Sequence, residues 1–364
     1  MTPQWKFPSP ADASPAIVEC RRGRPGALAG AGGTTAILKL VWFAGVCVVV
    51  GLILWTGAAG VFRAVAAAGW GVAAVVALRG VALTGAGFGW FFLFPPRSRP
   101  AALVCVAIRF LRDGANALLP ITQVGGEAIG ARALSLLGAP ASLAAASVIV
   151  DVLVQATTQF LFALVGLATL ASLRSVDAIR GAAAIIVAVA VPALGGFYLV
   201  QRPVGRRLIE GLLKSVAGGR KWRLFGAIDA LYARLGSIYA NRSGLAAAFC
   251  VHSSVWLFGA LEVWVILVFM GYPCGYPEAL VIESLMHTVR GAAFAIPSAL
   301  GVQEGALIAV CAIFGVPAEA AVAMSLIKRV PDFVFGLPSL VAWQVLEGRA
   351  PQRVAAGTEG GLGR

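Results

Sequence analysis

The sequence predicts an all-α, polytopic helical membrane protein with two inverted repeats, each containing a helical hairpin that is broken at a proline. Composition is the first indication: 59% of the residues are hydrophobic, 12% are charged, and the mean hydropathy is +0.88. Soluble globular chains are about 45–50% apolar and about 25% charged. Long, continuous apolar runs are the second indication, because the strands of a membrane barrel would alternate apolar and polar residues. A duplicated motif, described below, is the third.

Six apolar runs are long enough to cross a hydrocarbon core as helices, which takes about 20 residues. In chain order they are 36–59, 69–94, 141–171, 181–200, 243–270 and 320–346. The first exceeds the roughly 7–15 apolar residues of a signal peptide and is expected to remain as an anchor. Two further stretches, 101–138 and 278–316, are expected to form hairpins that either span the membrane or re-enter it. Residues 36–346 therefore make one transmembrane domain between two predicted disordered cytoplasmic tails, 1–35 and 347–364.

The distribution of basic residues predicts the orientation of these spans. Segment 201–242 carries nine Arg and Lys residues against two acids, and 95–100 and both tails are also basic. The turn 271–277, with the sequence GYPCGYP, carries no charge. Because basic loops stay on the cytoplasmic side, we expect both termini, 95–100 and 201–242 in the cytoplasm and 271–277 outside. The net charge of +13 then reflects orientation, and no nucleic acid partner is expected.

Segment 201–242 also has a helical pattern of its own. Apolar residues recur at helical spacing from Leu224 to Tyr239, which predicts an amphipathic helix. Its Arg and Lys residues would bind the anionic inner leaflet of the membrane. A helix packed on the protein's own cytoplasmic face explains the pattern equally well.

A motif around a single glutamate occurs twice, in PITQVGGEAIG (120–130) and PSALGVQEGAL (297–307). At one offset of 177 residues, Gly114, Pro120, Glu127, Gly138 and Pro140 match Gly291, Pro297, Glu304, Gly315 and Pro317. Between the two prolines the chain crosses the membrane an odd number of times, so the copies run in opposite directions. Many transporters build a substrate site near the midplane from such inverted repeats with broken helices. Proline at each hairpin tip frees backbone groups that need burial in protein or a wet cavity.

Further polar residues inside the apolar runs fall on helical faces. An intramembrane charge costs about 2.5–3.5 kcal/mol on insertion scales, so it is expected to be paired or functional. Because acids and bases are nearly balanced, we expect one enclosed polar cavity. The candidate cavity residues are Arg109, Arg112, Asp113, Gln123, Glu127, Asp151, His287, Arg290, Gln303, Glu304, Lys328, Arg329 and Asp332. Two alternatives remain: ion pairs that only lock the hairpins to the bundle, and snorkelling of Lys328 and Arg329 to an interface.

Cysteine and histidine usage argues against metal chemistry. The six cysteines are scattered singly, without a C-x-x-C pair, and the only histidines are His252 and His287. Neither a disulfide framework nor a zinc or haem site is expected, and no cofactor is predicted. No Walker A sequence is present, so ATP is not expected to drive the protein directly.

The two glutamate motifs carry a resemblance to a known family. LLPITQVGGEAIGARALSLLG with ASVIVDVLVQATTQF, and IPSALGVQEGALIAV with SLIKRVPDFVFGLPSLVAWQ, resemble the hopanoid-biosynthesis-associated HpnL family. That family is similar to the transmembrane flippase domain of lysylphosphatidylglycerol synthases, and the resemblance covers about 36–346. It implies a bacterial inner-membrane protein that handles an amphiphilic lipid, with hopanoids as the suggested cargo.

Three functions follow as hypotheses. The first is a lipid translocase or transport-associated protein, whose polar cavity receives a lipid head group while the tails stay in the bilayer. The second is a membrane enzyme that modifies a lipid head group, although no G-x-S-x-G, H-E-x-x-H or aspartate-rich diphosphate motif is present. The third is a scaffold for lipid-biosynthesis enzymes, which would dock on 201–242. We expect the first and no enzymatic activity.

Overall fold

The computed structural model describes residues 58–119, 121, 124–173, 178–216, 221–293, 295–296 and 299–359, with six single positions before residue 58. Within this part of the chain every regular element is a helix, as the sequence predicted. Pro120, Gln123 and Pro297 of the predicted site and hairpins lie outside the described residues. So do the predicted tail 1–35 and most of the predicted first span, 36–59.

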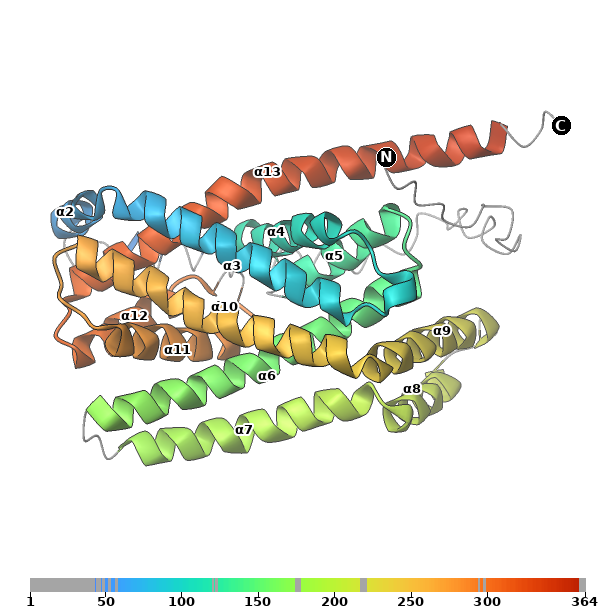
Figure 1. Ribbon diagram of the computed structural model, residues 1–364, viewed down its shortest axis with the longest axis horizontal. Helices are drawn as coiled ribbons and strands as arrows, with labels where there is room; N and C mark the ends of the chain where they lie inside the picture. The colour runs from blue at the N-terminus through green and yellow to red at the C-terminus, as the bar shows by residue number, and fades with distance from the viewer. Residues whose placement is uncertain are drawn as a thin grey trace.

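Long helices form the body of the bundle and run along its longest axis (Figure 1). Four of them are long and apolar enough to cross a membrane: α3 (Gly71–Leu93), α6 (Ala141–Leu173), α7 (Ala178–Val200) and α10 (Arg242–Phe269). They match the predicted runs closely, because a continuous apolar sequence gains most by being helical and buried in lipid. α13 (Ala318–Glu359) runs along the same axis and carries Lys328, Arg329 and Asp332 in its first half.

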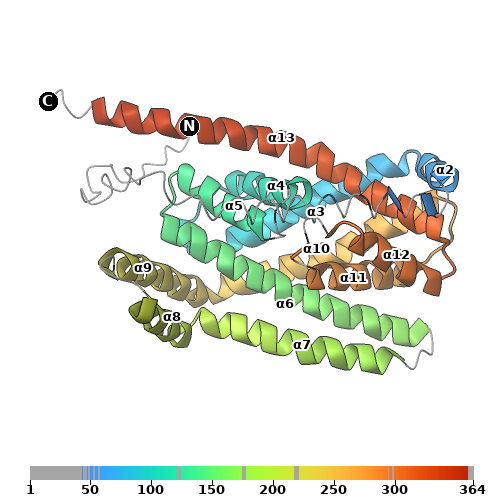
Figure 2. The ribbon, with the colours of Figure 1, turned by 180° about the vertical axis from the view of Figure 1, so that it is seen from behind.

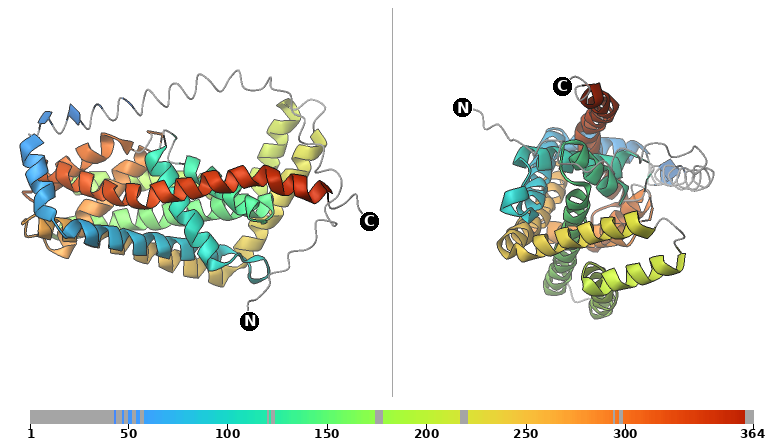
Figure 3. Two further views of the ribbon diagram at one scale, coloured as in Figure 1. Left: turned by 90° about the horizontal axis from the view of Figure 1, so that it is seen from above. Right: turned by 90° about the vertical axis from the view of Figure 1, so that its right-hand side faces the viewer.

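The bundle has a basic end and a neutral end. The basic end holds the 3₁₀ turn η3 (Pro96–Ser98) and the helices α8 (Pro203–Val216) and α9 (Lys221–Ala240), which lie across the long axis (Figure 3). The neutral end holds α2 (Ala58–Ala68) and the uncharged turn 271–275 between α10 and α11. The basic loops that sequence analysis placed on one side of a membrane therefore gather at one end of the molecule.

Two short-helix hairpins enter the bundle from these opposite ends. α4 (Ala102–Leu118) and α5 (Gly125–Leu136) occupy the basic half, and α11 (Tyr276–Ala292) and α12 (Val302–Ile313) occupy the neutral half (Figure 2). At 1.5 Å per residue, a 12-residue helix rises only about 18 Å, well short of a hydrocarbon core of about 30 Å. The hairpins therefore re-enter the end from which they came, and their tips approach each other inside the bundle.

The second helix of each hairpin ends with the same backbone geometry. Gly138 and Gly315 both have positive φ, 103° and 73°, a conformation that glycine adopts without a steric penalty. The following amides, of Ala139 and Val316, bond to Leu134 and Cys311, five residues back, which completes a Schellman motif each time. Pro140 and Pro317 then start α6 and α13 by accepting the first amides of those helices. The repeated glycine and proline spacing is thus a repeated helix stop and start.

Segment 201–242 holds two helices. The helix predicted from Leu224 to Tyr239 lies within α9, and α8 precedes it in the same segment. The second half of α9 buries Leu235 and Ile238 in the protein core, and the Tyr239 hydroxyl donates to Gln201 Oε1 at 2.7 Å. This half of α9 therefore packs on the protein itself. α13 continues past residue 346 to Glu359, where a disordered tail was predicted.

Candidate functional site

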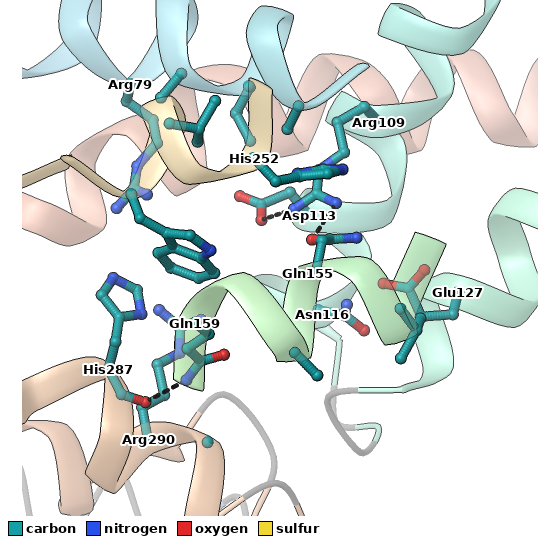
Figure 4. A pocket seen from close by; sticks show the side chains of 18 of the residues that line it. Arg79, Arg109, Asp113, Asn116, Glu127, Gln155, Gln159, His252, His287 and Arg290 are labelled. Carbon is teal, nitrogen blue, oxygen red and sulfur yellow. Dashed lines mark hydrogen bonds and ion pairs between the residues drawn. The ribbon is translucent and has the colours of Figure 1, made fainter. Parts of the chain in front are cut away.

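A cavity of about 400 Å³ lies inside the bundle, between the tips of the two hairpins. Both hairpins contribute to its wall, together with α3, α6, α10 and α13 (Figure 4). Its polar lining residues are Arg79, Arg109, Asp113, Asn116, Glu127, Gln155, Gln159, His252, His287, Arg290 and Asp332. Three arginines and three carboxylates line this space among apolar helices, an arrangement expected of a functional site within a membrane.

The charged groups near α4 and α5 form one connected set, which we call the hairpin-1 network. Its charged members are Arg109, Arg112, Asp113, Glu127 and Asp151. Arg112 is fully buried and pairs with both Glu127 and Asp151, the latter at 2.7 Å between Nη2 and Oδ2. Arg109 donates to Gln155 Oε1 at 2.7 Å and lies 3.9 Å from Asp113. Asp151 also accepts from Gln155 Nε2 at 2.8 Å and lies 3.0 Å from His252 Nε2.

Glycines make room for this network. A Cβ on Gly130 would stand 2.5 Å from Cγ of Arg112, so only glycine lets α5 lie against that side chain. At the hairpin tip, the Gly126 amide donates to Asn116 Oδ1 at 2.7 Å, which caps the start of α5 from α4. The close approach of α4 and α5 places Glu127 beside Arg112.

A second set, the hairpin-2 network, lies near α11 and consists of Arg79, Glu262, Glu283 and Lys328. Lys328 Nζ is buried and lies 2.9 Å from both oxygens of Glu283 and 3.3 Å from Glu262 Oε2. Arg79 Nη2 reaches the same Glu262 oxygen at 3.3 Å. On the cavity side, His287 Nε2 lies 3.1 Å from Glu283 Oε1, and its ring contacts Trp256 edge-on at 4.9 Å between centroids.

The motif glutamates occupy equivalent helix positions but have different surroundings. Each is the third residue of its short helix, where a carboxylate is favoured by the unpaired amides and the helix dipole. Glu127 lines the cavity. Glu304 is fully buried behind it: Oε2 accepts from its own cap, Gly301, at 2.7 Å, and Oε1 accepts from Ser325 and Arg329, each at 2.7 Å. The expected cavity role of Glu304 is therefore corrected, because its carboxylate is occupied in closing α12 onto α13.

The other predicted site residues fall into two groups. Arg109, Asp113, His287, Arg290 and Asp332 line the cavity, as does the motif residue Gly291. Arg112, Asp151, Gln303, Lys328 and Arg329 are not among the lining residues; apart from Gln303, which is buried in α12, they hold the ion pairs described above. Lys328 and Arg329 lie inside the bundle with carboxylate partners, so the snorkelling alternative does not apply to them.

The 177-residue offset relates further pairs that the sequence motif did not include. Asp113 and Arg290 are one such pair, and Gln155 and Asp332 are another; all four line the cavity. Asp151 and Lys328 are a third pair, and each is the buried centre of its network. Equivalent positions thus carry opposite or altered charges, so the two halves of the site are similar in place and different in chemistry.

Sequence reasoning missed Arg79, Glu262 and Trp256 and considered His252 only as a metal ligand. Arg79 is the single charge of α3, and Glu262 is the single acid of α10. A solitary charge in an apolar span is a usable signal, since it needs a partner within the membrane. Pairing Arg79 with Glu262, because their charges are opposite, would have predicted their contact. Among the described residues, no group of three or more His, Cys, Asp and Glu side chains is placed to hold a metal ion.

A second, apolar groove of about 500 Å³ lies on another face of α4. Side chains of α4, α5 and α13 line it, including Phe110, Phe335 and Trp343. α4 therefore forms a wall of both the polar cavity and an apolar groove.

This fold and this site define a polytopic helical membrane protein with a buried, charge-rich cavity between two opposed re-entrant hairpins. A family model described as the lysylphosphatidylglycerol synthase TM region matches residues 42–339, and the chain belongs to that family. Membership supports a membrane, lipid-related function and does not distinguish the HpnL subfamily. No curated protein and no solved structure gives a significant match to the chain.

Proposed function

We propose that this protein moves an amphiphilic lipid between the leaflets of a bacterial inner membrane. The head group would enter the polar cavity, while the tails remain in the hydrocarbon region outside the bundle. The cargo would be a hopanoid or a related lipid, as the resemblance of the glutamate motifs suggests. Both termini, η3, α8 and α9 would lie on the cytoplasmic side, where basic loops are retained.

The observation that carries this proposal is the placement of the cavity. Its charged lining lies between hairpin tips that enter from opposite ends. Lining residues fall near the middle of two helices long enough to span a bilayer, at Gln155 of α6 and at His252 of α10. Burying so many ionised groups is costly, and a structural bundle would be as stable with well-packed apolar residues in their place. A site that must replace the hydration of a polar head group is a physical reason to keep them.

The lining groups suit a head group with oxygens and charges. Arg109 and Arg290 would donate to phosphate or hydroxyl oxygens. Glu127 and Asp332 would accept from hydroxyl groups or bind a cationic group. The apolar groove beside α4 is suited to part of a lipid tail, because aliphatic and aromatic side chains line it.

Reconstitution tests the proposal. Purified protein in sealed vesicles, with a fluorescent lipid analogue in both leaflets, should bring inner-leaflet lipid to an added membrane-impermeant quencher. Asp332→Asn and Arg290→Gln should slow this movement at least tenfold. Arg132→Gln is the matched control, because Arg132 is an exposed arginine paired with Glu347 far from the cavity. Equal rates in all four proteins would contradict the proposal, and conversion of the lipid in detergent would favour the enzyme instead.

A further inference from the structure

Both histidines of the chain line the cavity, and each is bound to a carboxylate. His252 lies 3.0 Å from Asp151, and His287 lies 3.1 Å from Glu283. Histidine is the side chain whose charge ordinarily changes between about pH 5 and pH 8. The charge of each ring therefore decides the local charge balance of the site.

That balance is one positive charge short when both rings are neutral. The charged residues that line the cavity, belong to the two networks or form the Glu304–Arg329 pair comprise seven carboxylates and six basic groups. None of these thirteen side chains belongs to an exposed residue. An uncompensated charge in such surroundings is costly, so one further proton is favoured.

The missing charge belongs to the hairpin-1 network. There, Asp113, Glu127 and Asp151 face two arginines, Arg109 and Arg112. In the hairpin-2 network two carboxylates face two basic groups and are balanced. The deficit therefore lies beside His252.

The His252 ring lies against a carboxylate of the hairpin-1 network. Asp151 of α6 contacts Nε2 of the His252 ring. Arg112 and Arg109 of α4 interact electrostatically with the same Asp151 carboxylate. On the α3 side, Gly89 lies against the ring, where a Cβ would stand 2.7 Å from Nε2. The Asp151 carboxylate thus contacts His252 through Oδ1 and Arg112 through Oδ2.

The His287 ring lies against a carboxylate that a lysine already binds. Glu283, its carboxylate on α11, is bound through both oxygens by Lys328 of α13. Arg290 lies one turn further along α11, so a second positive charge stands on the same helix. α10 presents the Trp256 ring, and α6 presents Gln159, whose amide donates to the His287 carbonyl oxygen at 2.8 Å.

We infer that the cavity is a proton-binding site, in which His252 carries a proton in this conformation and His287 is neutral. Resting on the proposed function, the same proton couples to lipid movement, because His252 and Glu127 share the cavity wall with any head group. A head group that adds positive charge would displace the proton, and one that adds negative charge would retain it.

Nuclear magnetic resonance of the two imidazole rings tests the proton site without any transport. The protein, labelled with ¹⁵N-histidine and purified without a histidine tag, should show one imidazolium and one neutral ring at pH 7, assigned with His252→Gln and His287→Gln. In Glu127→Gln the hairpin-1 network is balanced, so the His252 ring should become neutral. Glu347→Gln is the control, since Glu347 pairs with exposed Arg132, and both rings should keep their wild-type states.

Two results would overturn the proton site. One is a neutral His252 in the wild type, which would place the extra proton on a carboxyl group; Asp332, close to Arg79 and Arg290 but also to Asp113, is the rival holder. The other is a His252 ring that stays charged in Glu127→Gln. Either result is read from wild-type protein or from a variant that keeps Arg112 paired with Asp151.

The coupling has a separate test in vesicles. One unit of pH difference across the membrane should shift the steady distribution of the lipid up to about tenfold, the factor that one proton provides. Any lipid movement that remains in the His252→Gln protein should not depend on the pH difference. Movement that ignores the gradient in the wild type would remove the coupling. Absence of any movement, with the expected ring states, would instead refute the translocase and leave the proton site standing.

Discussion

Gly114 of α4 lies against Gly336 of α13 so closely that a Cβ on Gly114 would stand 2.6 Å from the Gly336 Cα. Gly291 lies 177 residues after Gly114 and is approached in the same way. A Cβ on Gly291 would stand 2.8 Å from Nε2 of Gln159 on α6. Gln159 itself stands 177 residues before Gly336. In each hairpin, therefore, a glycine packs against the long helix of the other repeat. The two contact positions on those long helices are equivalent.

Gly114→Ala should lower the stability of the protein because backbone, not a mobile side chain, occupies the space. Overpacking of this kind costs about 1–3 kcal/mol. The measurement is the midpoint of thermal unfolding in detergent. Gly305→Ala is the control, since a Cβ there meets nothing within 4 Å, and its midpoint should be unchanged or higher. Equal midpoints for the two variants would mean that α4 and α13 do not pack at Gly114.

The motif glutamates should respond differently to the same substitution. Glu304→Gln leaves the Arg329 guanidinium without its buried partner and should destabilise the fold by about 3–5 kcal/mol. Adding Arg329→Met should restore much of that loss. Glu127→Gln should destabilise less, because Arg112 keeps Asp151. Denaturant unfolding followed by tryptophan fluorescence compares the three proteins, and equal losses for both glutamates would contradict the asymmetry.

Gly138 and Gly315 should be equally sensitive to a side chain if the two helix stops are equivalent. Alanine at a positive φ costs roughly 1–2 kcal/mol. Both Gly138→Ala and Gly315→Ala should therefore lower the unfolding midpoint by similar amounts, although a Cβ at either site has open space. Gly305→Ala again serves as the comparison. A loss in one variant alone would show that the copies differ at this turn.

The turn at the neutral end offers a test of orientation and of thiol chemistry. Burial, assisted by the nearby Glu278 carboxylate, raises the pKa of Cys274 to about 11. The reactive thiolate is therefore scarce at neutral pH, and alkylation of a variant that keeps only Cys274 should accelerate about tenfold per pH unit up to about pH 11.

Pro273→Cys, at an exposed position in an otherwise cysteine-free protein, should react readily from the periplasmic side of intact cells. Reaction only after the inner membrane is opened would reverse the proposed topology.

Hydropathy located four of the six predicted spans, 69–94, 141–171, 181–200 and 243–270, as apolar helices long enough to cross a membrane. The predicted run 69–94 became α3, Gly71–Leu93, and 243–270 became α10, Arg242–Phe269. Burial in lipid rewards every residue of such a run, so its boundaries are nearly those of the helix. The extension of α13 to Glu359 was missed, because that segment gives no hydropathy signal.

The site was less accessible to sequence reasoning. Two identical spacings made Glu127 and Glu304 look alike, and only the position of Arg329 against α12 separates a cavity group from a structural one. That distinction depends on which side chains meet across helices, which no single-sequence pattern contains. Arg79 was missed for a related reason. It is the only charged residue of α3, so it forms no periodic pattern with other charges in that helix.

The depth at which the hairpin tips meet also places charges in the site within the membrane potential. A charge that crosses the whole membrane changes its energy by about 2.3 kcal/mol per 100 mV of membrane potential, and a charge held halfway across experiences about half of that. The cavity lies between hairpins that each fill only one half of the bundle, so a proton or a charged head group inside it sits within this field. Under the proposed function, membrane voltage would therefore act on any charge that the site carries, even with equal pH on both sides.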